Sequence, residues 1–145
     1  MPFEPRDPAF EARVRASFTR QAVTTTLQAT MTRVEPGEVE IELPFRQDLT
    51  QQHGYLHAGI ITTIVDSACG YAAYSLMAAQ AEVLTVEYKV NFLAPAQGER
   101  FIARGRVTRA GRTLTVCAGE VVALQEGREA LIATMLTTMM AVQGK

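Results

Sequence analysis

The residues that could do chemistry gather in one stretch of this sequence, residues 51–77. The stretch opens with a polar loop that contains both histidines of the chain, His53 and His57. At Ala58 the loop gives way to small and apolar residues that could pack as a helix on nearly every side, and Asp66 is the only carboxylate among them. A lone carboxylate is costly to bury unless it is paired, hydrogen-bonded or used. A helix start offers N–H groups without partners, so the two features together predict attack on a carbonyl group.

The distance between these two features predicts how the site is assembled. Asp66 follows Ala58 by eight residues, which places it about 12 Å further along a helix. A general base must lie within hydrogen-bond reach of the nucleophile that it activates. If both features serve one reaction, Asp66 must therefore come from another subunit. Two copies with antiparallel central helices would form a homodimer with two sites at its interface.

Simpler interpretations of the same residues remain open. The Asp66 carboxylate could instead bond to a hydroxyl on its own helix, because Thr62, Thr63 and Ser67 are close in sequence. His57 could be a loop histidine that caps or packs locally. His53 is interpreted as a loop residue without a chemical role.

Composition excludes several classes of function. The 145 residues suit a single domain with one core. A formal net charge of −1 gives no electrostatic case for binding nucleic acid or an anionic membrane. The two cysteines, Cys69 and Cys117, have no ligand-like spacing, so we expect buried free thiols and no metal site. No secretory leader or membrane span is evident, which predicts a cytoplasmic protein.

The elements that would position these residues follow from the periodicity of the chain. Asp7-Pro8 is typical of a helix start, and apolar residues then recur every four positions, at Phe10, Val14 and Phe18. We expect a helix over about residues 8–20, within an N-terminal helical segment at 1–22.

Alternating and β-branched residues predict about six strands. They cover residues 24–31, 38–45, 82–92, 99–109, 113–124 and 130–142. A central helix at 57–79 that is apolar on all sides has to be covered by other elements, because none of its faces suits water. The sequence therefore predicts one α+β domain over residues 1–145, in which an antiparallel sheet wraps around that helix.

The pattern of the central stretch resembles a known family. Gln51, Gly54, His57, Ala58 and Gly59 occur at the spacing Gln-x-x-Gly-x-x-His-Ala-Gly, and Asp66 follows His57 by nine residues. This series resembles the hotdog-fold acyl-CoA thioesterases, in particular the PaaI-like (phenylacetate-degradation) branch, which is related to the 4-hydroxybenzoyl-CoA thioesterases. The segments at 84–96 and 111–114 also resemble that family. The resemblance covers about residues 20–142 and implies the hotdog fold.

The resemblance implies a role for each matching residue. Asp66 would be the general base that activates water, or the attacking nucleophile, and Thr85 would help to hold that water. The N–H of Ala58 would polarise the thioester oxygen, with Gln51 as a second donor or positioning group. The remaining residues would bind substrate: His57 near the thioester sulfur, Gly59 beside the acyl chain, and Arg112 as a candidate contact for the CoA phosphates.

One departure from the family pattern is Ala58, where the family has glycine. Alanine keeps the N–H, but its methyl group narrows the site and leaves the acyl preference open. The substrate implied is a medium-chain or aryl acyl-CoA, with CoA as part of the substrate rather than a cofactor. The resemblance leaves dimer and tetramer open. Two other functions remain as alternatives, a hotdog enoyl-CoA hydratase or dehydratase and a non-catalytic acyl-CoA-binding module.

Overall fold

The computed structural model describes residues 3–144 of the chain. Its helices are α1 (Phe10–Arg20), α2 (Ala22–Leu27) and α3 (Ala58–Tyr74), with a 3₁₀ turn at Gln47–Leu49. Its strands are β1 (Thr30–Glu35), β2 (Glu38–Pro44), β3 (Ala81–Phe92), β4 (Arg100–Ala110), β5 (Leu114–Gln125) and β6 (Arg128–Gln143). None of the helices within residues 3–144 is both long and apolar enough to cross a membrane.

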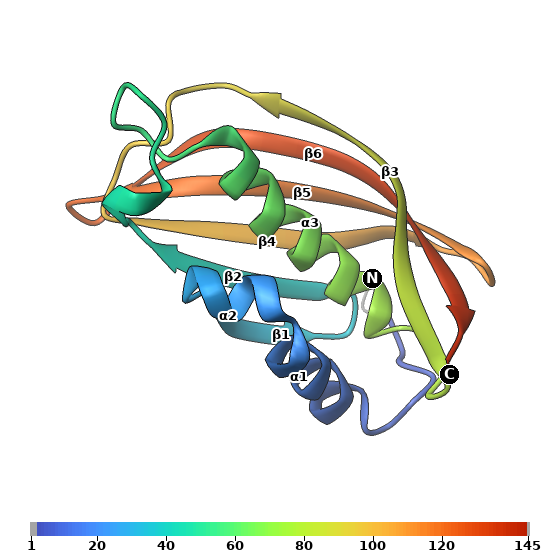
Figure 1. Ribbon diagram of the computed structural model, residues 1–145. Coiled ribbons are helices and arrows are strands. Elements are labelled where there is room, and N and C mark those ends of the chain that lie inside the picture. The colour runs from blue at the N-terminus through green and yellow to red at the C-terminus, as the bar shows by residue number, and fades with distance from the viewer. Residues whose placement is uncertain (1–2, 145) are drawn as a thin grey trace.

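The six strands form one antiparallel sheet in the order β1-β2-β4-β5-β6-β3. Figure 1 shows this sheet curving around α3, with α1 and α2 beside α3 near β1 and β2. The predicted α+β architecture, a six-stranded antiparallel sheet around a central helix, is confirmed. Although β3 directly follows α3 in the chain, it pairs only with β6 within the described residues and forms one edge of the sheet.

The core lies between α3 and the concave face of the sheet, and two glycines set how close they come. Gly105 of β4 and Gly119 of β5 lie directly opposite each other under α3. A Cβ added to Gly105 would lie 2.5 Å from the Cys69 backbone nitrogen, and one added to Gly119 would lie 2.7 Å from the Cys69 Sγ. This glycine pair lets the helix backbone rest almost directly on the sheet.

The two cysteines belong to this core, as predicted. Both are buried free thiols, and the Cys117 thiol donates a hydrogen bond to the Cys69 carbonyl oxygen at 3.6 Å. Burial raises the pKa of Cys117 to about 12, so the thiol stays protonated and unreactive at neutral pH.

The strand predicted over residues 24–31 is wrong in its first half. Thr24 and Thr25 belong to α2, and β1 begins only at Thr30. Both threonine hydroxyls donate to the Gln21 carbonyl oxygen, at 3.1 and 3.3 Å. This local bonding favours a helical turn over the extended form that β-branching suggests. Gln28, in the left-handed region with φ 61°, then ends the helix.

The central helix is also shorter than predicted, because it ends at Tyr74 rather than at residue 79. The Ser75 hydroxyl donates to the Ala72 carbonyl oxygen at 2.6 Å. Arg13 of α1 donates to the carbonyl oxygens of Tyr74 and Met77, at 3.2 and 2.9 Å. In a longer helix these carbonyl oxygens would accept backbone N–H groups of the following turn. Because side chains donate to them instead, the apolar run after Tyr74 folds as turns.

A β-bulge in β3 decides which residues face α3. The register shifts between Thr85 and Glu87, so Thr85 and Tyr88 both face the helix although they are three residues apart. Strict alternation would put Leu84 and Tyr88 on one face of the strand, and the bulge prevents this. Leu84 instead lies opposite Met140, and both side chains are exposed.

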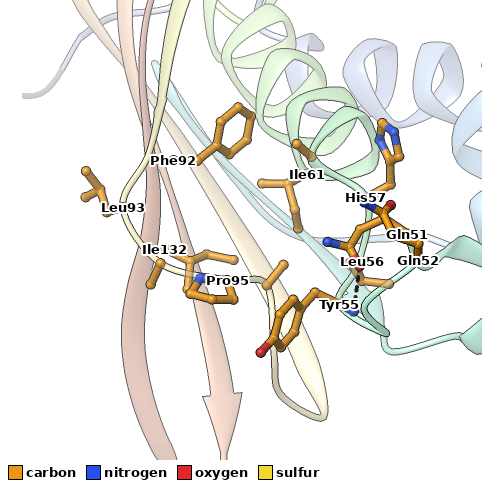
Figure 2. A pocket seen from close by; sticks show the side chains of 13 residues that line it. Gln51, Gln52, Tyr55, Leu56, His57, Ile61, Phe92, Leu93, Pro95 and Ile132 are labelled. Carbon is orange, nitrogen blue, oxygen red and sulfur yellow. Dashed lines mark hydrogen bonds between the residues drawn. The ribbon is translucent and has the colours of Figure 1, made fainter.

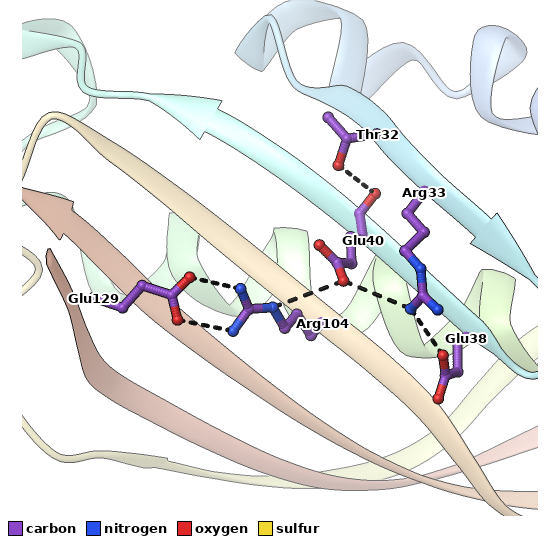
Figure 3. Close-up of polar contacts among 6 residues, drawn as sticks. All are labelled: Thr32, Arg33, Glu38, Glu40, Arg104 and Glu129. Carbon is purple, nitrogen blue, oxygen red and sulfur yellow. Dashed lines mark hydrogen bonds and ion pairs between the residues drawn. The ribbon is translucent and has the colours of Figure 1, made fainter. Parts of the chain in front are cut away.

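The convex face carries a row of alternating charges that runs from β1 across β2 and β4 to the start of β6. Figure 3 shows Arg104 paired with Glu129 at 2.7 Å and with Glu40 at 3.8 Å, while Arg33 contacts Glu38 at 2.8 Å. Such exposed pairs add little stability each, but opposite charges on facing strands help to fix the register. The glutamates of β2 therefore belong to the solvated face of the sheet.

Candidate active site

The start of α3 leaves one backbone donor free. Nδ1 of His57 accepts the N–H of Gly59 at 2.8 Å, so His57 is the N-cap of the helix. The N–H groups of Ile60 and Ile61 donate to the His57 carbonyl oxygen. Among the residues that the structure describes, the Ala58 N–H has no acceptor. The free donor is thus at the position predicted to polarise a thioester oxygen, and His57 has the capping role of its simpler interpretation.

The loop before α3 fixes the orientation of Gln51. Its Oε1 accepts the backbone N–H groups of His53 and Tyr55, at 2.6 and 3.3 Å. Because both partners are donors, the side-chain oxygen must face them. The amide nitrogen is left as a donor without an acceptor among residues 3–144, which is compatible with the second donor role predicted for Gln51.

A cavity of about 580 Å³ opens beside this loop. In Figure 2, Phe92, Leu93, Pro95 and Ile132 lie across from Tyr55, Leu56 and Ile61. The rest of the lining consists of Gln51, Gln52, His57, Ala58, Ala94 and Ala96. The cavity therefore combines apolar walls with amide donors at one end, a combination typical of sites for small organic groups.

Asp66 lies elsewhere on α3 and is held by β3. The Thr85 hydroxyl donates to Asp66 Oδ1 at 2.9 Å. Burial raises the pKa of the Asp66 carboxyl above its ordinary value, and the Thr85 hydrogen bond partly offsets this increase. The hydroxyls on its own helix bond elsewhere: Thr62 to the Ala58 carbonyl, Thr63 to the Gly59 carbonyl and Ser67 to Gln21. The simpler interpretation of Asp66 is therefore wrong.

Within one chain the two halves of the predicted site do not meet. Two smaller cavities adjoin Asp66, and neither is lined by Ala58 or Gln51. Gly59 lines one of them, beside the carboxylate rather than in the large cavity. The structure thus brings Gln51, Ala58 and His57 together at one place and Asp66 and Thr85 together at another.

Arg112 lies in the β4–β5 turn, where the Gly111 N–H donates to the Leu114 carbonyl. Thr115, three residues after Arg112, pairs with Met139 of β6 on one side, and Thr85 of β3 pairs with Met139 on the other. Thr115 and Thr85 therefore lie at the same level along the strands. Arg112 lies about 10 Å along the strand direction from that level, at the same end of the sheet as Thr85 and its partner Asp66. Its role as a contact for CoA stays a prediction.

Sequence reasoning missed Gln21, which lines both cavities around Asp66. Gln21 follows the helix predicted over residues 8–20, and nothing in the local pattern links it to residue 66. Phe92 and Tyr55 were likewise not singled out as cavity residues. No group of three or more metal-binding side chains occurs within residues 3–144.

Comparisons with known proteins bear on the fold and the family of this chain. The Thioesterase superfamily model matches residues 53–130, more than half of the chain. A crystal structure of a thioesterase family protein from Silicibacter pomeroyi is 55% identical, with a TM-score of 0.92 over 93% of this chain and 99% of that one. The E. coli PaaI protein from the phenylacetic acid degradation operon is 16% identical, with a TM-score of 0.83 over 94% and 95% of the two chains. The PaaI likeness shows the fold alone.

A protein of Saccharolobus solfataricus named "Putative esterase" is 37% identical over 83 residues, which are 57% of this chain and 59% of that protein. The chain spans less than two thirds of the length of the curated relatives that it matches, 55–60%. The hotdog fold implied by the motif is confirmed by the structural neighbours. The family follows from the matched model and from the 55% identical structure: the chain belongs to the thioesterase superfamily.

Proposed function

We propose that this protein hydrolyses acyl-CoA thioesters to a free acid and CoA, with Asp66 as the general base. The observation that supports this most directly is the free N–H of Ala58 at the mouth of an apolar cavity. A donor held there without an acceptor is ready to bind an oxygen on which negative charge develops. The acyl group would lie against Phe92, Pro95 and Ile132 of the same cavity.

The reaction needs two chains. Because Ala58 and Asp66 of one chain do not share a cavity, each site would combine Ala58 and Gln51 of one protomer with Asp66 and Thr85 of its partner. The free edge of β3 supports this arrangement. It is twelve residues long and exposes Leu84, Val86 and Tyr88, and a long apolar strand edge is normally covered by another strand. Antiparallel pairing of two β3 strands would extend the sheet and place the α3 helices antiparallel.

The proposed step is addition of water followed by loss of thiolate. Thr85 and Asp66 hold a water molecule, and the carboxylate takes its proton as the oxygen attacks the thioester carbon. The resulting oxyanion is stabilised by the N–H of Ala58 and the amide of Gln51. When the C–S bond breaks, the proton on Asp66 passes to the departing CoA thiolate, which restores the carboxylate.

The test is thiol release from a panel of short-chain, medium-chain, phenylacetyl and benzoyl CoA esters. Asp66→Asn should lower turnover at least about 100-fold, because it removes the general base. Ala58→Pro should lower turnover by a similar factor of roughly 100, because it removes one oxyanion donor. Proline is well tolerated at the first position of a helix, so α3 should still form.

Ala58→Gly is the matched control, since glycine keeps the N–H. It should retain most activity, and a change in acyl preference would show that the methyl group narrows the cavity. Thiol release from no ester, or undiminished release by Asp66→Asn, would remove the proposed function.

A further inference from the structure

Gln21 stands at the corner between α1 and α2, and its side chain reaches α3. The Ser67 hydroxyl donates to Gln21 Oε1 at 3.3 Å, and Ser67 is the residue next to Asp66. The Gln21 backbone carbonyl is fixed in turn by the Thr24 hydroxyl and the Thr25 N–H, at 3.1 and 3.3 Å. The corner and the helix together hold the end of this side chain beside the carboxylate.

Two cavities meet at this point. The front cavity, about 390 Å³, is lined by Val23, Gly59, Thr62, Thr63, Tyr88 and Val90 in addition to Gln21, Asp66 and Ser67. The rear cavity, about 160 Å³, is lined by Ser17, Gly70, Tyr71, Glu82, Val83, Thr85 and Met139 in addition to the same three residues. Gln21, Asp66 and Ser67 therefore belong to both linings and stand between the two spaces.

The rear cavity suits water better than an acyl group. Most of its lining is polar, and the Ser17 and Tyr71 hydroxyls form a hydrogen bond of 3.1 Å at its wall. Its volume accommodates several water molecules, each of which takes roughly 30 Å³ in the liquid. Ser17 of α1 contributes to the wall of the rear cavity, whereas Tyr88 and Val90, further along β3, contribute to the wall of the front cavity.

We propose that Gln21 is a positioning residue for the water that Asp66 activates, and that the rear cavity supplies this water. The inference rests on the proposed function and extends it to the N-terminal helices, which lie outside residues 53–130 of the family match. Thr85 occupies Oδ1 of Asp66. A water on the other carboxylate oxygen could bond to the Gln21 amide, because an amide offers both a donor and an acceptor.

The first arm of the test separates positioning from substrate binding. Gln21→Ala should lower kcat about tenfold, because a poorly oriented water attacks less often, and should leave KM within about twofold. Ser67→Ala removes the hydroxyl that holds the Gln21 amide. The losses in kcat caused by Ser67→Ala and by Gln21→Ala should therefore not be additive in the double variant. Thr26→Ala, an exposed position on α2, is the matched control and should behave as the wild type.

The second arm asks whether residue 21 faces Asp66. The titratable groups near Asp66 are Cys69 and Tyr71 of α3 and Glu82 and Tyr88 of β3. Ser17 of α1, Gln21 between the helices and Val23 of α2, which line the two cavities, are uncharged. The cation on this side is Arg20 of α1, whose charge favours the ionised form of Tyr71. Gln21→Glu therefore adds one new negative charge beside the carboxylate, which disfavours the ionised base. The acidic limb of kcat/KM should move to higher pH, a shift that a merely structural role would not produce.

The outcomes are distinguishable because wild type and Asp66→Asn are measured beside these variants. If wild type releases thiol in an Asp66-dependent way, but Gln21→Ala keeps full kcat and Gln21→Glu leaves the acidic limb in place, only the role of Gln21 is overturned. A rise in KM at unchanged kcat would also overturn it, since Gln21 would then bind substrate. If wild type itself releases no thiol, the proposed function fails first and the inference falls with it.

Discussion

At the scale of single residues, the chemistry of Asp66 depends on two opposing influences. Burial disfavours its charged form, and the Thr85 hydroxyl favours it. For the general-base role proposed for Asp66, the first influence raises the pKa towards the working pH, and the second keeps the carboxylate ionised. The hydrogen bond comes from a residue 19 positions away in sequence.

Thr85→Val removes the hydroxyl and keeps the shape of the side chain. Without this hydrogen bond the pKa of Asp66 rises further, so the ionised base is lost at a higher pH as the solution is acidified. We expect the acidic limb of kcat/KM to move to higher pH and turnover at neutral pH to fall about tenfold. Thr138→Val is the control, since Thr138 bonds to Glu87 at 2.6 Å and not to Asp66. An unchanged pH profile in Thr85→Val would contradict this account.

Asp66→Asn should also change how stability depends on pH. Because folding raises the pKa of Asp66, the folded state favours the protonated form. The stabilisation that the protonated carboxyl gives is fully present below the pKa that Asp66 has in the unfolded chain. It is lost as the pH rises through the pKa that Asp66 has in the folded protein. Asparagine stays neutral throughout, so the Tm of the variant should exceed that of wild type at pH 7 and approach it at acid pH. Thermal unfolding at several pH values measures the difference, and a variant that is less stable at pH 7 would refute the prediction.

At the scale of elements, the separation of α3 from the sheet is set by Gly105 and Gly119. Any larger residue there would push the helix away from β4 and β5. Since Asp66 reaches Thr85 and Ala58 reaches the cavity only with α3 in this position, the glycine pair indirectly positions both halves of the site.

Gly105→Ala should therefore destabilise the fold strongly. Its new Cβ would meet the backbone of Ala68 and Cys69, which cannot move independently of the helix. We expect a loss of about 3 kcal/mol or more in the free energy of unfolding, at the upper end of overpacking effects. Urea unfolding measures it. The control is Gly70→Ala on α3, where a Cβ would lie 3.8 Å from Met139, and where alanine should be neutral or stabilising by up to about 1 kcal/mol.

At the scale of the whole molecule, the proposed shared site allows a complementation experiment. In Asp66→Asn and in Ala58→Pro, both sites of each homodimer are defective. A mixed dimer combines the intact Asp66 of one variant with the intact Ala58 of the other at one site, and both defects at the second. After subunit exchange of equal amounts, about a quarter of wild-type activity should return.

The measurement is thiol release before and after mixing, with each variant alone as the control. A mass label on one variant shows whether subunits have exchanged. If they exchange and activity does not return, Ala58 and Asp66 either serve different reactions or act together within a single chain.

The sequence by itself determined the fold class and the position of the candidate site. Alternation along β2 and β4 and the apolar run of α3 are local patterns, and each reports directly which side chains must be buried. The spacing from Ala58 to Asp66 also needed no structure, because the rise of a helix is constant. For the same reason the sequence predicts that the proposed base and the proposed oxyanion donor belong to different chains, and this stays a prediction.

Only the tertiary structure decided what those residues contact. Alternation cannot reveal the bulge in β3 that turns Tyr88 towards the helix, since a bulge depends on pairing with β6. Local propensity misplaced Thr24 because its hydroxyl bonds to Gln21 within a helical turn. The contact of Ser67 with Gln21 joins residues 46 positions apart. Such contacts depend on packing between distant elements, and the physical reason that they escape prediction is that no local pattern records them.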